Sequence, residues 1–127
     1  MHRERVSENV YWFQSEVYAQ VTAGVIAGPQ WAVVIDTLAL PDETLSSREF
    51  IERELNVPVR YVINTHFHAD HAWGNCFFPG ATIVAHEHCR AMLEERGIPS
   101  LEAAKRQNPA MRQVKISLPH MTFKNGE

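Results

Sequence analysis

The residues best suited to do chemistry lie together in the segment NTHFHADHAWGN, positions 64–75. Three imidazoles and one carboxylate fall close together there, at His66, His68, Asp70 and His71. Imidazole nitrogen and carboxylate oxygen suit zinc, and they also suit iron or manganese. Because residues two apart in an extended chain point to the same side, we expect His66 and His68 to converge, with Asp70 continuing the alternation. The pattern predicts two incomplete metal sites side by side, His66 with His68 and Asp70 with His71.

Apolar runs rich in β-branched and aromatic residues predict the strands that position this segment. The run WAVVID ends in Asp36, and the run VRYVIN leads directly into the histidines. The predicted strands cover 9–14, 20–27, 31–36, 59–64, 81–85, 114–119 and 121–124.

Three helices are predicted between these strands. Ser46 and Glu49 form a capping-box pattern at the start of the first one. The second is expected to end at Gly97, and the third to stop before Pro109. The predicted helices cover 46–55, 87–96 and 100–108.

Composition narrows the classes of partner and compartment. A chain of 127 residues with 45% hydrophobic residues can form one domain with a core. A net charge of −3 argues against a nucleic-acid partner, and no apolar run approaches the roughly 20 residues that cross a membrane. The N-terminal MHRERVSENV lacks a signal-peptide pattern, so we expect a cytoplasmic protein in which Cys76 and Cys89 are reduced thiols.

The segment THFHADH resembles the H-x-H-x-D-H signature of the metallo-β-lactamase-fold superfamily of metal-dependent hydrolases. WAVVIDT resembles that family's strand ending in aspartate, and GN followed by FPGATIVAHE resembles its next loop and strand. The resemblance implies an α+β fold, half of the family's αββα sandwich, with a mixed sheet and helices on one face. Residues 1–127 would form the N-terminal half of such a domain.

The end of the sequence favours the same interpretation. Asn125-Gly126 is a strong hairpin signal, which predicts a returning strand. We therefore expect a truncated domain, although a frayed tail is the alternative.

The resemblance also implies roles for particular residues. His66 and His68 would bind a first metal ion, and Asp70 and His71 a second. Asp70 would also be catalytic, orienting the metal-activated water. Asp36 would steady the motif loop from behind the ligands, and His86 would lie near the site without being a standard ligand. The implied cofactor is one or two Zn²⁺ ions, with iron or manganese as alternatives.

The implied function is the hydrolysis of a small-molecule ester, thioester, lactam or phosphoester by metal-activated water. The family's remaining ligands lie in its second half, so we expect this chain alone to be a poor hydrolase. Two alternatives remain: a catalytically incomplete metal-binding half-domain that acts through self-association, and an iron-dependent sulfur oxygenase on the same fold. Because half a sandwich leaves the inner apolar face of its sheet open, we expect a homo-oligomer, a dimer joined through the strands at 31–36, 59–64 and 81–85.

Overall fold

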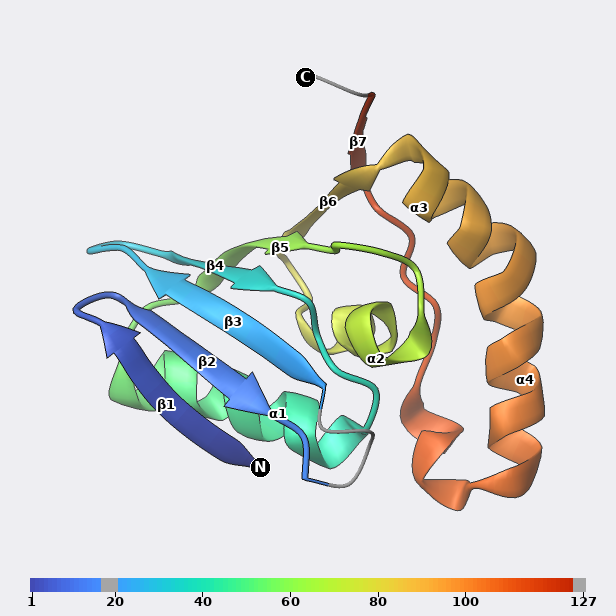
Figure 1. Cartoon of the computed structure of the whole chain (residues 1–127), viewed down its shortest axis with the longest axis horizontal. Helices are drawn as coiled ribbons and strands as arrows, with labels where there is room; N and C mark the ends of the chain where they lie inside the picture. The colour runs from blue at the N-terminus through green and yellow to red at the C-terminus, as the bar shows by residue number, and fades with distance from the viewer. Residues whose placement is uncertain (17–20, 125–127) are drawn as a thin grey trace.

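One mixed sheet organises the chain, which the computed structural model describes over residues 1–16 and 21–124 (Figure 1). Its seven strands lie in chain order from β1 to β7. Neighbours from β1 to β4 are antiparallel, and those from β4 to β7 are parallel. The strands are β1 (His2–Ser7), β2 (Val10–Gln14), β3 (Thr22–Ala27), β4 (Ala32–Ile35), β5 (Val59–Ile63), β6 (Thr82–His86) and β7 (Met121–Phe123). This architecture confirms the predicted α+β class with a mixed sheet.

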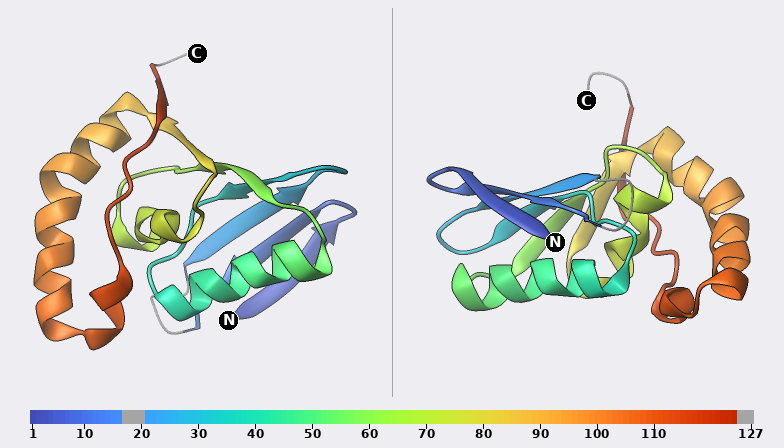
Figure 2. Two further views of the ribbon diagram at one scale, coloured as in Figure 1. Left: turned by 180° about the vertical axis from the view of Figure 1, so that it is seen from behind. Right: turned by 60° about the horizontal axis from the view of Figure 1, so that its bottom comes forward.

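Helices follow the parallel strands. In Figure 2, α1 lies along one face of the sheet, and a longer helical run stands at the end that carries β6 and β7. Among the described residues, no helix is long and apolar enough to cross a lipid bilayer. The helical segments are α1 (Pro41–Glu49) with a π-helical turn (Phe50–Glu54), α2 (Ala69–Ala72) with a 3₁₀ turn (Trp73–Phe77), α3 (Glu87–Met92) with a π-helical turn (Leu93–Gly97), α4 (Ile98–Gln107), and a 3₁₀ turn (Pro109–Gln113).

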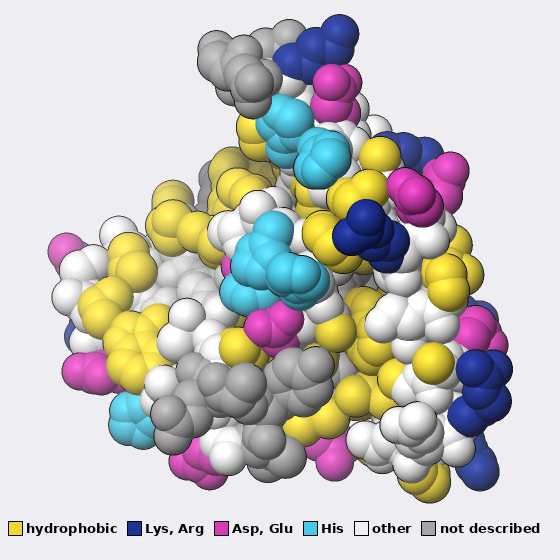
Figure 3. Space-filling view, turned by 45° about the vertical axis from the view of Figure 1, so that its right-hand side comes forward, with side chains coloured by type: hydrophobic (Ala, Val, Ile, Leu, Met, Phe, Trp, Pro, Cys, Tyr) yellow, Lys and Arg dark blue, Asp and Glu magenta, His cyan; other side chains and the backbone are white. Residues whose placement is uncertain are grey.

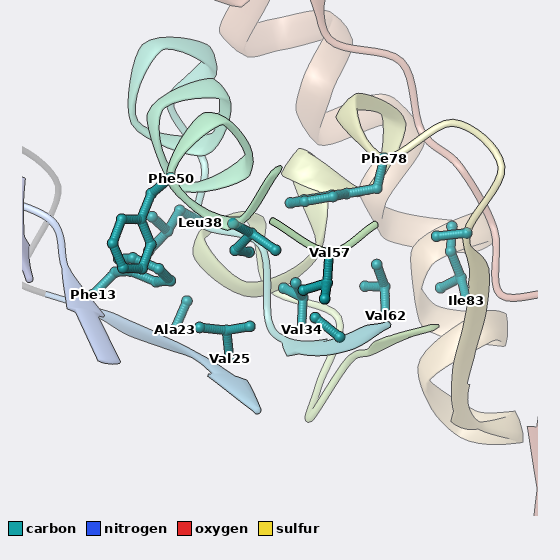
Figure 4. Close-up of a cluster of buried hydrophobic side chains, with 13 residues drawn as sticks. Phe13, Ala23, Val25, Val34, Leu38, Phe50, Val57, Val62, Phe78 and Ile83 are labelled. Carbon is teal, nitrogen blue, oxygen red and sulfur yellow. The ribbon is translucent and has the colours of Figure 1, made fainter. Parts of the chain in front are cut away.

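The main core lies between the sheet and α1 (Figure 4). Alternate strand residues point to this side, because successive side chains in a strand face opposite ways. Phe50 meets Phe13 edge-on, with ring centroids 5.9 Å apart. The buried residues of this cluster are Phe13, Ala23, Val25, Ala32, Val34, Leu38, Phe50, Ile51, Val57, Val62, Phe78, Ala81 and Ile83.

The opposite face of the sheet is also apolar. Ile26 pairs with Val33, which in turn pairs with Tyr61, while Ile35 pairs with Ile63. These residues alternate with the core residues along their strands, and Ile26 is 44% exposed. We call this set the open face: Trp12, Ile26, Val33, Ile35, Tyr61, Ile63 and Val84. A sheet that is apolar on both sides is typical of strands that are covered twice.

The predicted start of the first helix is wrong. The helix begins at Pro41, and Leu40 precedes it without a side-chain cap, so Ser46 lies inside the helix and forms no capping box. Pro41 suits this place because its fixed φ matches the first helical turn, where a missing N–H costs nothing. Asp42 and Glu43 add favourable negative charge at the same end.

Gly97 also does not end a helix as predicted. Its φ of −64° and ψ of −44° are helical, and the chain continues from α3 into α4. The backbone N–H of Ile98 bonds to the carbonyl of Leu93, five residues back, so the helix is widened by one residue just before Pro99. A wider turn of this kind accommodates a proline that would otherwise interrupt the hydrogen-bond ladder.

Two strand assignments differ from the prediction. The segment 114–119 is irregular rather than a strand, and it packs Val114 and Ile116 against the helices. β1 was not predicted, because all of its side chains are exposed and give no apolar alternation. Position 20 and the predicted hairpin turn at 125–126 lie outside the described residues.

Gly74 has no space for a side chain, because its backbone touches the segment after β4. A Cβ on Gly74 would lie 2.1 Å from the carbonyl oxygen of Thr37 and 2.7 Å from the hydroxyl of Thr44. We expect Gly74→Ala to lower the free energy of unfolding by about 3 kcal/mol, since overpacking must displace backbone. Urea denaturation followed by circular dichroism measures the change.

The matched control is Gly24→Ala, where the nearest atom to an added Cβ is 3.7 Å away. It should stay within about 0.5 kcal/mol of the parent protein. Equal losses in the two variants would contradict the close approach at Gly74.

Candidate metal centre

The parallel strands bring the site residues to one edge of the sheet. β4, β5 and β6 are parallel neighbours, so their carboxyl ends meet at that edge. Asp36 directly follows β4, the segment 64–75 follows β5, and His86 ends β6. Ligand sites of open parallel sheets form at this edge.

The side chain of Asp36 links the residues that follow β4 and β5. Its side chain is buried, and its Oδ1 accepts a hydrogen bond from the backbone N–H of Thr65 at 2.7 Å. Its Oδ2 accepts from the Thr65 hydroxyl at 2.6 Å and contacts His71 Nδ1 at 2.7 Å. The structure thus places Asp36 behind the histidine segment, in contact with Thr65 and His71.

His66 and His68 approach each other, but not by strand alternation. β5 ends at Ile63, and the next residues form bends, so the extended geometry assumed for this pair is wrong. The two rings nevertheless lie edge to face, with centroids 5.0 Å apart. Two imidazoles bound to one tetrahedral zinc would have centroids roughly 5 Å apart, given a Zn–N distance of about 2 Å.

Asp70 and His71 come from a helix rather than from an extended chain. Both belong to α2, which begins at Ala69. His71 Nε2 lies 3.2 Å from Asp70 Oδ2, and its ring lies 3.8 Å from that of His66, centroid to centroid. The four predicted ligands therefore form one contiguous group.

Hydrogen bonds define which ring nitrogens are left for a ligand. The Thr65 hydroxyl donates its single hydrogen to Asp36, so at 3.1 Å it accepts from His66 Nδ1. His71 Nδ1 likewise donates to the Asp36 carboxylate. In their neutral forms both rings then present Nε2 as an acceptor, the arrangement in which a carboxylate or hydroxyl orients a metal-binding histidine.

The four side chains could bind metal as two pairs of ligands, but they do not form a complete site. Two ligand atoms, each about 2 Å from a tetrahedral ion, are roughly 3.3 Å apart, close to the spacing between His71 Nε2 and Asp70 Oδ2. Across residues 1–16 and 21–124, no group of three His, Cys, Asp or Glu side chains is arranged to hold an ion. Burial, followed by the nearby His71, lowers the pKa of His66, which favours the neutral form that binds metal.

His86 lines a cavity beside this group. The cavity measures about 360 Å³ and is bounded by Thr65, His66, Phe67, His86, His88 and Cys89. His86 Nδ1 accepts the backbone N–H of His88, and its ring meets Phe123 edge-on. Figure 3 shows histidine side chains gathered on this side of the molecule among hydrophobic ones.

Several polar residues behind the histidines are not predicted by the sequence pattern. Asn64 and Asn75 are buried and hydrogen-bonded to each other, and Thr37 bonds to Asn75. Thr65 joins Asp36 to His66. The available signal was Asn64, a polar residue that directly follows a buried apolar run.

Comparisons with known proteins agree on one family. The family model described as the metallo-beta-lactamase superfamily matches residues 18–105. A metallo-beta-lactamase from Pontibacter korlensis superposes with a TM-score of 0.72 at 20% identity, covering 96% of this chain and 52% of that one. The metallo-beta-lactamase FIM-1 from Pseudomonas aeruginosa, in its mono-zinc form, gives 0.70 at 15% identity, with 96% and 50% covered. A metallo-beta-lactamase from Hirschia baltica gives 0.72 at 16%, with 99% and 53% covered.

These likenesses show a shared fold. The present chain spans about half the length of the structures it matches.

Cys89, which lines the cavity, is expected to be a slowly reacting thiol. Burial, and secondarily the negative charge of Asp36, raises the pKa of the Cys89 thiol to about 11. In a Cys76→Ser variant, where Cys89 is the remaining thiol, we expect a chromogenic disulfide reagent at pH 8 to react about 100-fold more slowly than in the unfolded chain, because the thiolate is the reacting form. The rate should rise about tenfold per pH unit up to the pKa. Equal rates for folded and unfolded protein would contradict this placement of Cys89.

Proposed function

Since this chain belongs to the metallo-beta-lactamase superfamily, we propose that it is the metal-binding part of a zinc-dependent hydrolase. The proposal assigns His66 and His68 to one ion, and Asp70 and His71 to a second. It extends to the substrate, a small molecule with a hydrolysable ester, thioester, lactam or phosphoester bond.

One observation supports the proposal most directly. His71 donates Nδ1–H to Asp36, so in the neutral ring Nε2 is an acceptor, and it lies 3.2 Å from Asp70 Oδ2. Two acceptor atoms at that distance repel each other unless a proton or a cation lies between them. A metal ion satisfies both, and the family supplies the reason to expect one.

Different residues of this chain would have different roles in the hydrolysis. When bound, the ion supplies an activated water at neutral pH. Asp70 would hold and orient that water through its carboxylate, while Asp36 keeps the His71 ring in the tautomer that presents Nε2. The cavity beside His66 and Phe67 would receive the group next to the scissile bond, with Phe67 as an apolar wall.

Zinc binding is the first test. We expect the purified chain to bind zinc stoichiometrically. The double variant His66→Ala/His68→Ala should lose that stoichiometric binding, because it removes both proposed ligands of the first ion. Isothermal titration with zinc measures both. The matched control is His2→Ala, which removes a histidine from β1. Unchanged zinc content in the double variant would refute the assignment.

Measurements of turnover and of metal content on the same protein distinguish the candidate functions. Zinc-dependent turnover of any of a panel of esters, thioesters, lactams and phosphoesters, even if slow, supports the hydrolase when it is lost in Asp70→Asn. Stoichiometric zinc with no detectable turnover of any of them supports the catalytically incomplete half-domain. Iron in protein purified without added metal supports the sulfur oxygenase.

We also propose that the open face binds a second copy of this chain. The open face carries apolar side chains on five adjacent strands, β2 to β6, and apolar surfaces on monomers mark interaction sites. The relatives are about twice as long, so two copies make a unit of comparable size. Covering the face would bury the side of the sheet that α1 leaves bare.

Light scattering at micromolar concentration tests this assembly. We expect a mass near twice 14.5 kDa, and a monomer for Ile26→Lys, because a charge within a buried apolar contact is costly. The control is Ile98→Lys on α4, which has a similar exposure, 42% against 44% for Ile26, but lies off the open face. A folded parent protein of 14.5 kDa would exclude the dimer.

A further inference from the structure

We infer that Asn75 is a positioning residue for the metal centre, acting through Asn64 on the backbone of His71. The inference rests on the proposed function, because it concerns how a metal ligand is held. Among the residues that the structure describes, neither amide forms a hydrogen bond to an imidazole, so both act through other groups.

The two amides form a reciprocal pair that uses all of their hydrogens. Asn75 Nδ2 donates to Asn64 Oδ1 at 2.7 Å and to the carbonyl of Ser117 at 3.2 Å. Asn64 Nδ2 donates to Asn75 Oδ1 at 3.0 Å and to the carbonyl of His71 at 3.1 Å. The two residues are only 2% and 3% exposed, so water cannot replace these bonds. Each amide is therefore fixed in one orientation.

The pair holds the carbonyl of His71 in place. That carbonyl lies in the last turn of α2, where carbonyls lack partners within the helix. It accepts hydrogen bonds from Asn64 and from the backbone N–H of Thr37 at 3.0 Å. Because Asp36 holds the ring of the same residue, His71 is fixed at its backbone and at its side chain.

Packing alone does not explain a buried amide pair. Two apolar side chains of similar shape would fill the same space without the cost of removing amides from water, and such exchanges can be neutral for stability. What apolar side chains cannot do is donate to the His71 carbonyl. The network also joins four segments, through Thr37, Asn64, Asn75 and Ser117, and buried networks of this kind specify one geometry.

The test replaces both amides with apolar side chains, in Asn64→Leu/Asn75→Leu. We expect a folded, cooperatively unfolding protein in which His71 is no longer held. In metal-free protein, the NMR resonance of His71 Nδ1–H should shift or broaden. Zinc affinity by titration should fall at least tenfold, the loss typical of removing groups that orient metal ligands.

The control is Ser47→Ala, which removes another buried hydrogen bond, from the Ser47 hydroxyl to the carbonyl of Thr44 at 2.7 Å. A merely structural role predicts that this control and the double variant behave alike. We expect the control to leave both the His71 resonance and the zinc affinity unchanged. An unchanged His71 resonance in the double variant, with zinc affinity within twofold of the parent, would overturn the inference.

A second variant keeps the test decisive if the double variant does not fold. Thr37→Val preserves shape and removes only the hydroxyl, which lies 3.0 Å from Asn75 Oδ1 and 3.3 Å from the His71 carbonyl. It should change both readouts in the same direction, with about a threefold loss of zinc affinity, and no change in either would overturn the inference. A parent protein that binds no zinc would refute the proposed function alone, because the His71 resonance still decides the positioning role.

Discussion

The arrangement of the histidine segment depends on the carboxylate of Asp36. Asp36 has a left-handed φ of 63°, and Leu38, two residues later, has one of 65°. Such conformations cost non-glycine residues of the order of 1–3 kcal/mol. Three hydrogen bonds to Asp36, each 2.7 Å or shorter, offset that cost, since bonds to charged groups contribute about 1.5–3 kcal/mol. The chain after β4 is therefore bent so that one carboxylate reaches the loop after β5.

The parallel half of the sheet makes this contact possible. Asp36 and Thr65 are 29 residues apart in sequence, yet both stand at the carboxyl ends of neighbouring parallel strands. The crossover between those strands runs through α1, which covers the core face. The loops after β4 and β5 can approach each other closely because residue 74 is glycine, and there is no room for a side chain beside Thr37. Core packing and site geometry are thus consequences of the same crossover.

Local signals predicted much of the fold and of the candidate site. Strands β2 to β6 follow from apolar runs, because these strands carry apolar side chains on both faces and therefore in consecutive residues, and the histidine group was visible as a motif. β1 has no such mark, since its side chains are exposed and only its pairing with β2 makes it a strand. The amide pair of Asn64 and Asn75 was equally hidden, because its partners are defined by the crossing of loops rather than by sequence spacing.

The hydrogen bonds of Asp36 also link the two predicted metal pairs. Asp36 Oδ2 orients His71 directly, and the same oxygen accepts the Thr65 hydroxyl, which in turn accepts from His66. One carboxylate therefore selects the same tautomer in a member of each pair, although the two pairs lie on different local structures, a bend and a short helix. A disturbance of Asp36 would release both rings together. The two proposed pairs are consequently linked through one carboxylate, which contacts His71 directly and His66 through Thr65.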